Sequence, residues 1–426
     1  MTQQSTPPIP QCAESRLSPD GAETLNLLDT VSLYLHIPFC HAKCHYCDFN
    51  SYAGMLGLRE EYVAALRDEI LLAGRRARRG NGEPRRCRTV FFGGGTPSLL
   101  TPAQIGDLLA ATRAAFALDP DAEVTMEANP GALEYSQLDA VHAAGVTRLS
   151  MGAQSFDPAL LRWMGRIHSP AEITTAFRAA RSAGFTNVSL DFIFALPGQT
   201  QVVWLETLER AMDLGPDHLS LYNLIVEEGT PLFMWVERGT VREVDEDAAA
   251  DMYEAAQERL AQAGYLQYEI SNWARPGHAC AHNLTYWRNL PWIGLGAGGA
   301  SFYAGQRFTE TRPIREYIAG VRATLAAART NGDAESLPAA AIASREEISR
   351  TMEMGETAML GLRLTEGISL EAFAVRYSVG FWETFGARLA EFRALGLIEE
   401  AEGRARLTPR GRMVGNEIFA RVLPDD

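Results

Sequence analysis

Three cysteines in the segment CHAKCHYC are the residues of this chain best suited to chemistry. Cys40, Cys44 and Cys47 follow the apolar run VSLYLHIPF with the spacing C-x3-C-x2-C. Four thiolates usually hold a cubane iron-sulfur cluster, so three thiolates leave one iron open to an exchangeable ligand. The alternative is a zinc site with His41 or His45 as its fourth ligand, because thiolates suit zinc as well.

The other cysteines and the composition indicate a globular protein from a reducing compartment. Cys12, Cys87 and Cys280 are isolated in the sequence, so we expect neither a second zinc-binding couple nor a disulfide framework. With 426 residues, 46% hydrophobic and 22% charged, the chain is long enough for two or three domains. No apolar stretch is long enough to span a bilayer, and residues 1–30 read as a flexible tail without a signal peptide. We therefore expect a cytoplasmic protein.

The charge balance opposes nucleic acid as a partner. Thirty-nine Lys and Arg against fifty-three Asp and Glu give a net charge of −14, which repels a phosphate backbone. The exception is the arginine-rich segment RRARRGNGEPRRCR, residues 75–88. Its central Gly and Pro favour an exposed helix end and loop over an anion site.

Apolar strand-like runs alternate with amphipathic helical stretches in the first part of the chain. Strands are expected at residues 32–37, 89–92, 123–128, 147–152, 187–196 and 218–226, and helices at 58–74, 101–117, 136–145, 170–184 and 200–215. This alternation predicts an α/β fold with an incomplete TIM-type (β/α)6 barrel over residues 31–240. The different pattern over residues 241–426 predicts a C-terminal α+β domain that ends in a winged-helix-like unit.

Polar residues and glycines fall just after five of the expected strands, where the loops of such a barrel carry its chemistry. They are the three cysteines, Gly93 to Thr96, Glu127 with Asn129, Gln154, and Asp191. Exposed amides of the glycines suit a carboxylate or a ribose, and the carboxylates suit ribose hydroxyls or an ammonium group. The set predicts a zwitterionic, sugar-bearing ligand beside the open iron, although each residue alone has an ordinary structural explanation.

In combination, these residues resemble the radical S-adenosylmethionine (SAM) proteins. The motifs are YLHIPFC-x3-C-x2-C, GGGTP, E-x-N-P and G-x-Q-S-F, and the resemblance runs from about residue 31 to the C-terminus. Within these proteins, the chain is similar to the branch that contains oxygen-independent coproporphyrinogen III oxidase and the HemW heme chaperones. The resemblance implies a [4Fe-4S] cluster on the three cysteines, with SAM on the fourth iron, and an electron donor such as flavodoxin or ferredoxin. It also implies cleavage of SAM to methionine and a 5'-deoxyadenosyl radical.

The resemblance assigns roles to further residues by matching position. Tyr34 would lie next to the cluster and SAM, and a second group would form the SAM pocket: Gly94, Gly95 and Thr96 at the methionine end, with Glu127, Gln154, Arg166 and Asp191 completing it. Arg166 would otherwise pass for a surface arginine.

The segment HNLTYW, from His282 to Trp287, is similar to the HNxxYW motif of the HemW chaperones, which is linked to heme. A neutral imidazole of His282 is a suitable axial ligand for heme iron, and Tyr286 and Trp287 are candidates to cover a porphyrin face. Cys280 and His278 are rival ligands. The ordinary alternative is a core histidine with satisfied hydrogen bonds.

Asp48 and Phe49 distinguish between the two branches, since the oxidase pattern continues after Cys47 with one residue and a further cysteine. The departure favours a heme chaperone that passes heme to an acceptor protein such as a respiratory enzyme. The alternatives are a coproporphyrinogen III oxidase, which removes carboxyl groups from two propionates, and a zinc-stabilised adaptor.

Residues 294–299, GLGAGG, formally fit a dinucleotide fingerprint, but no clear strand precedes them and no helix follows, so we expect a turn.

Overall fold

The computed structural model describes residues 26–131, 137–331 and 337–424, so most of the expected N-terminal tail lies outside the described residues. Within these ranges a large sheet carries six neighbouring parallel strands, as the sequence predicts. They are β1 (Thr30–Ile37), β4 (Arg86–Gly94), β5 (Ala117–Ala128), β6 (Arg148–Gln154), β7 (Val188–Phe194) and β8 (His218–Asn223). The α/β barrel fold is therefore confirmed, and the carboxyl ends of all six strands meet at one edge.

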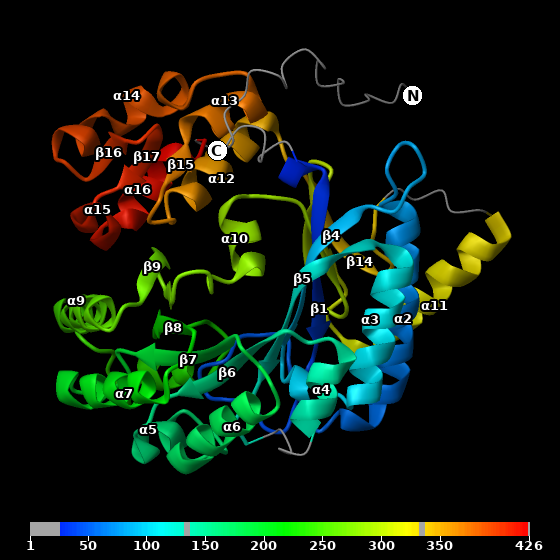
Figure 1. Cartoon of the computed structure of the whole chain (residues 1–426), viewed down its shortest axis with the longest axis horizontal. Coiled ribbons are helices and arrows are strands. Elements are labelled where there is room, and N and C mark those ends of the chain that lie inside the picture. Colours follow the sequence, from blue (N-terminus) through cyan, green and yellow to red (C-terminus); the bar gives the residue numbers. More distant parts are fainter. Residues whose placement is uncertain (1–25, 132–136, 332–336, 425–426) are drawn as a thin grey trace.

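Helices follow these strands and cover the outer face of the sheet (Figure 1). The main ones are α2 (Arg59–Arg76), α3 (Pro102–Ala115), α4 (Leu138–Ala144), α6 (Pro170–Ser182) and α7 (Gln201–Leu214). Shorter segments are β2 (Phe39–Cys40), β3 (Tyr52–Ala53), η2 (Leu56–Leu58), η3 (Pro97–Leu99), α5 (Pro158–Trp163) and α8 (Pro231–Glu237). Capping boxes begin two of the long helices, with Thr101 at α3 and Ser169 at α6, and each satisfies otherwise unpaired backbone amides.

The sheet extends beyond the barrel strands at both edges. At one edge β11 (Trp292–Leu295) pairs parallel with β1, followed by antiparallel β12 (Ala300–Tyr303), β13 (Gln306–Glu310) and β14 (Ile342–Glu347). At the other edge β10 (Asn272–Ala274) and β9 (Leu266–Glu269) continue from β8, with α9 (Glu246–Gln262) before them and α11 (Ile314–Asn331) near the first edge. The boundary expected between residues 240 and 241 thus falls inside one sheet, because strand periodicity does not reveal which strands pair.

The segment GLGAGG connects β11 to β12. The expectation of a turn was right, but the expectation that no strand precedes it was wrong, since its first residues belong to β11. A strand of four residues is too short for sequence periodicity to identify.

The C-terminal unit has its own hydrophobic core, separate from that of the sheet. It contains α12 (Arg350–Gly361), β15 (Ile368–Ser369), α13 (Leu370–Tyr377), α14 (Phe381–Ala394), β16 (Ile398–Ala401), β17 (Arg404–Leu407), α15 (Pro409–Met413) and α16 (Gly415–Val422). Two helices followed by an antiparallel hairpin agree with the winged-helix-like end that the sequence predicts. We propose that the division of the chain lies near residue 348, where this second core begins.

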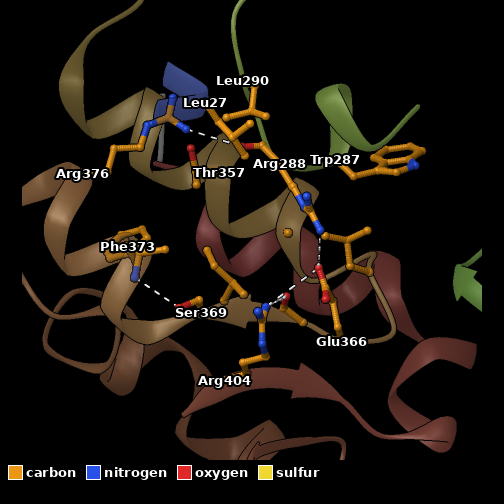
Figure 2. A pocket seen from close by; sticks show the side chains of 15 residues that line it. Leu27, Trp287, Arg288, Leu290, Thr357, Glu366, Ser369, Phe373, Arg376 and Arg404 are labelled. Atoms are coloured by element: carbon orange, nitrogen blue, oxygen red, sulfur yellow. Dashed lines mark hydrogen bonds and ion pairs between the residues drawn. The ribbon is translucent and has the colours of Figure 1, made fainter. Parts of the chain in front are cut away.

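A short helix, α10 (Ala281–Trp287), lies between the inner side of the sheet and the C-terminal unit (Figure 1). Between α10 and the C-terminal unit lies a cavity of about 110 Å³, which is lined by residues that include Leu27 and Trp287 (Figure 2). On the cavity wall, Glu366 forms an ion pair with Arg288 at 3.1 Å and a second one with Arg404 at 3.9 Å (Figure 2). Each of these arginines therefore faces the same carboxylate.

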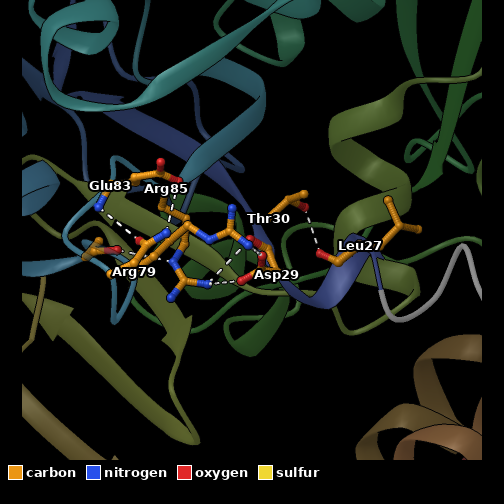
Figure 3. Close-up of polar contacts among 8 residues, drawn as sticks. Leu27, Asp29, Thr30, Arg79, Glu83 and Arg85 are labelled. Atoms are coloured by element: carbon orange, nitrogen blue, oxygen red, sulfur yellow. Dashed lines mark hydrogen bonds and ion pairs between the residues drawn. The ribbon is translucent and has the colours of Figure 1, made fainter. Parts of the chain in front are cut away.

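The arginine-rich segment after α2 is held by contacts within the chain. Asp29 forms ion pairs with Arg79 and with Arg85, the latter at 3.0 Å (Figure 3). Arg86 pairs with Asp119 at 2.6 Å. These contacts favour the structural interpretation of this segment over an anion site.

No helix in the described part of the chain is both long and apolar enough to cross a bilayer.

Candidate functional site

One cavity of about 530 Å³ occupies the inner side of the barrel and opens at the carboxyl ends of its strands. It is lined by all twelve residues that the sequence analysis assigned to the cluster, SAM or the heme iron: Cys40, Cys44, Cys47, Tyr34, Gly94, Gly95, Thr96, Glu127, Gln154, Arg166, Asp191 and His282. They come from the cysteine loop, from five strands or the turns after them, from the segment between α5 and α6, and from α10. The structure therefore brings the predicted set together, while the ligands that these residues hold remain a prediction.

The three thiols lie half-buried on the loop after β1. Two of their sulfur atoms accept hydrogen bonds at 3.5 Å, Cys40 from the hydroxyl of Thr96 and Cys44 from the guanidinium of Arg166. Such donors stabilise thiolates and tune the potential of a cluster. Among the described residues, no three metal-binding side chains converge on a single point as the ligands of one metal ion do.

His45, a candidate fourth ligand in the zinc alternative, already has a partner. Its Nδ1 lies 2.8 Å from the carbonyl oxygen of Trp163, and its ring contacts Trp235 with centroids 4.9 Å apart. These contacts explain the presence of this histidine in the cysteine loop without a metal.

Tyr34 reaches the cavity from β1 and is held by a buried histidine. Nε2 of His36 lies 2.8 Å from the carbonyl oxygen of Asn50, which only accepts, so Nε2 carries the proton. Nδ1 is then the acceptor for the Tyr34 hydroxyl at 3.1 Å. Burial lowers the pKa of His36 to about 4, so this neutral tautomer persists at physiological pH.

The three glycines after β4 are required by the chain that packs on them. A Cβ on Gly93 would lie 2.8 Å from the ring of Tyr34, and one on Gly94, whose φ is +111°, would lie 2.5 Å from the ring of His36. A Cβ on Gly95 would lie 2.6 Å from the carbonyl oxygen of Phe39. The glycines thus allow the cysteine loop to lie directly on the end of β4.

Gly95→Ala is therefore expected to lower the free energy of unfolding by about 1–3 kcal/mol, as overpacking against backbone does. Denaturant titration would measure this, and iron binding after reconstitution should fall with it. The matched control is Gly57→Ala, whose Cβ meets nothing within 4 Å. Equal effects of the two substitutions would show that the close contact at Phe39 is unimportant.

Two carboxylates face the cavity, Glu127 and Asp191. Glu127 accepts the amide hydrogen of Gly94 at 2.9 Å, and burial raises the pKa of Glu127 to about 7. Asp191 accepts hydrogen bonds from the hydroxyls of Ser150 and Ser189 at 2.7 and 2.8 Å. Both orientations are fixed by neighbouring strands, which suits the binding of hydroxyl or ammonium groups.

The end of β6 carries local strain. Gln154 adopts a φ of +64° after an irregularity in the pairing with β7. Beside it, Arg166 donates to Asn129 Oδ1 at 2.9 Å and to the carbonyl of Gly152 at 2.8 Å. A non-glycine residue in the left-handed region is uncommon and concentrates at binding sites.

The HNLTYW segment forms α10, and its aromatic residues separate to two sides of the molecule. His282 is 1% exposed, and both ring nitrogens are engaged, Nδ1 with the hydroxyl of Thr89 at 2.7 Å and Nε2 with that of Tyr286 at 2.9 Å. Burial lowers the pKa of His282 to about 3, so the imidazole is neutral. Trp287 lines the smaller cavity of Figure 2 and not the large one. Tyr286 and Trp287 therefore line different cavities, because successive side chains diverge by about 100° around a helix, and their expected contact with a porphyrin face stays a prediction.

The rival ligands near this helix have other surroundings. Cys280 is buried and donates to Glu123 Oε1 at 3.3 Å, and burial raises the pKa of this thiol to about 12. Cys280 lines the large cavity, whereas His278 does not.

Sequence reasoning missed three polar residues deeper in the cavity, Arg148, His218 and Tyr268. Nε2 of His218 lies 2.9 Å from the hydroxyl of Tyr268. A signal for two of them was present, since polar residues repeat at every second position in β6 and β8 and so share the inward face. Tyr268 follows from no such pattern.

Comparisons with known proteins agree with this geometry. The radical SAM superfamily model matches residues 34–211, and the HemN C-terminal domain model matches residues 348–414. The chain is 35% identical to the heme chaperone HemW of Bacillus subtilis over 92% of this chain and 99% of that protein. Identity to the heme chaperone HemW of Escherichia coli is also 35%, over 93% and 99%.

A solved structure shows the same fold. Coproporphyrinogen III oxidase from Escherichia coli, a radical SAM enzyme, has a TM-score of 0.75 and covers 94% of this chain and 92% of its own length. Its sequence identity is 23%, so the likeness concerns the fold alone.

Proposed function

The chain belongs to the radical SAM superfamily and, within it, to the family of the HemW heme chaperones, and we propose that it binds heme and passes it to an acceptor protein such as a respiratory enzyme. The observation that carries the proposal is the similarity to named heme chaperones over nearly the whole length of both chains. The single cavity that collects the predicted residues supports it.

We propose that the cysteine end of the cavity holds a [4Fe-4S] cluster and SAM. The donor set fits, because three thiols share one opening and Thr96 and Arg166 donate to two of the sulfurs. When bound, the cluster and SAM would supply one-electron redox chemistry. The chain's own residues would bind and orient the cofactors, with Glu127, Gln154 and Asp191 near the hydroxyl and ammonium groups of SAM.

His282 is the proposed heme ligand, through Nε2. That nitrogen faces the hydroxyl of Tyr286, so binding of iron requires the hydroxyl to move away. The contact of Nδ1 with Thr89 would keep the ring oriented, as outer hydrogen bonds do for metal-bound histidines.

Tyr286→Phe is therefore expected to strengthen heme binding, because it removes the group that competes for Nε2, whereas His282→Ala should weaken it by about tenfold or more. Absorbance titration of the full chain with heme measures both. Weaker heme binding by Tyr286→Phe, or unchanged binding by His282→Ala, would remove His282 from the heme site.

One experiment separates the chaperone from the decarboxylase. The anaerobically reconstituted protein is given coproporphyrinogen III, SAM and reductant, and in parallel is titrated with heme. The proposal predicts heme binding without turnover of the porphyrinogen. Protoporphyrinogen formation would establish the oxidase instead.

A further inference from the structure

A buried arginine lies deep in the large cavity without a protein partner. Arg148 is 2% exposed, and it lines the cavity from the beginning of β6. Its Nε has no hydrogen-bond partner, and among the described residues its guanidinium forms no ion pair. Buried charges are normally paired, so an unpaired guanidinium that faces a cavity indicates a missing anion.

The nearby carboxylates do not fill this role, because other donors already occupy them. Glu123 accepts hydrogen bonds from the thiol of Cys280 and from the amides of Ala281 and His282. Asp191 on β7 accepts hydrogen bonds from two serine hydroxyls, and one of them belongs to Ser150, which lies on β6 with Arg148. Their charges act on Arg148 only over a distance.

A second unsatisfied group stands beside the arginine. Thr125 on β5 is the register partner of Arg148 on β6, and its buried hydroxyl also has no hydrogen-bond partner. Thr125 itself does not line the cavity, so the guanidinium of Arg148 is the donor available to a carboxylate there.

Arg148 is distant from Gln154 of the proposed SAM site, whereas Asp191 of that site lies nearer, through its hydrogen bond with Ser150. Arg148 and Gln154 lie six residues apart on β6, which corresponds to about 20 Å along a strand. Gln154 lies at the strand end near the cysteine loop, whereas Arg148 lies at the opposite end. Aromatic side chains line the part of the cavity near Arg148. One of them is Phe91, whose ring stacks on that of His282 with centroids 5.0 Å apart.

We propose that Arg148 binds a propionate carboxylate of a tetrapyrrole whose flat ring lies among the aromatic side chains of the inner cavity. This inference rests on the proposed heme binding and names the group that orients the heme. Arg148 and His282 line the same cavity. One residue would thus bind the iron and the other an edge of the same macrocycle.

The test compares heme with heme dimethyl ester, in which both propionates are uncharged, on the full reconstituted chain. The native chain is expected to bind heme about 10- to 100-fold more tightly than the ester, the range for a charge-assisted hydrogen bond. Arg148→Gln should remove this preference by weakening heme alone, and Arg148→Lys should restore part of it. Arg404→Gln, which removes a cation from the smaller cavity, is the matched control and should keep the preference.

The outcomes distinguish this inference from the proposed function. Heme binding with a preference that survives Arg148→Gln would overturn the role of Arg148 and leave the chaperone proposal standing. Loss of the preference in Arg404→Gln would move the propionate site to the smaller cavity. If Arg148→Gln weakened SAM binding and not heme binding, the carboxylate would belong to SAM. If the native chain bound neither heme nor ester, the proposed function itself would fall.

Discussion

Cys44→Ser is expected to abolish the iron-sulfur cluster, because two thiolates and a hydroxyl do not replace three thiolates as ligands of a cubane. Absorbance and iron content of protein reconstituted without air would measure the loss. The same result is expected for Cys40 and Cys47, since all three thiols line one opening. SAM affinity should fall together with the cluster, because the proposed SAM site is completed by the open iron.

Cys87→Ala is the control for this experiment. Cys87 is fully buried in β4, donates to the carbonyl of Thr89 at 3.4 Å, and does not line the cavity. Its replacement should leave the cluster content unchanged. Equal loss of iron in Cys87→Ala and Cys44→Ser would mean that the cysteine loop has no special role.

Glu69→Ala is expected to lower the free energy of unfolding by about 3–5 kcal/mol, the cost of removing one member of a buried charged network. Glu69 on α2 is 0% exposed and accepts hydrogen bonds from Tyr317 Oη at 2.6 Å and from the amide of Gly296 at 2.8 Å. It also contacts Glu310 of β13, which is itself 0% exposed. The substitution would leave these groups unpaired inside the protein.

Glu61→Ala on the same helix is the control. Glu61 is 54% exposed and pairs with Arg322 at 2.9 Å, so its loss should cost less than about 1 kcal/mol. Denaturant unfolding of both variants at one pH makes the comparison. Similar stabilities of the two variants would contradict a network role for Glu69.

The two buried carboxyls also predict how stability depends on pH. Burial, with the charge of Glu69, raises the pKa of Glu310 to about 10 from its ordinary 4.5. Between these values the folded chain holds one proton that the unfolded chain has lost, so stability falls as pH rises, by at most about 1.4 kcal/mol per pH unit. The contribution is fully present below pH 4.5 and is lost as pH rises through about 10. Glu310→Gln, which keeps a hydrogen-bond donor without a titrating proton, should flatten the dependence between pH 5 and 9. A slope equal to that of the native chain would contradict the raised pKa of Glu310.

Predictions made from the sequence succeeded where one strong regularity applied. Carboxyl ends of parallel strands meet at one edge, so residues as distant in sequence as Cys40 and Asp191 were expected to share a site, and they line one cavity. The same alternation predicted the six parallel strands.

The remaining features depend on pairing and direction, which local patterns do not contain. The joining of β11 to β1 brings residues 292 to 295 beside residues 32 to 35, and no periodicity in four residues predicts it. The separation of Tyr286 and Trp287 into different cavities follows only once α10 is placed. The alternation of polar residues in β6 places Arg148 on the inward face, but it does not show that the arginine has no ion-pair partner there.

Electron paramagnetic resonance of the reduced, anaerobically reconstituted protein, before and after addition of SAM, tests the central claim most directly. An iron-sulfur cluster with one open iron predicts a spectrum that changes when SAM binds, together with iron and labile sulfide in the proportions of a [4Fe-4S] cluster. A protein that retains stoichiometric zinc without labile sulfide, or a cluster spectrum that SAM leaves unchanged, would contradict it.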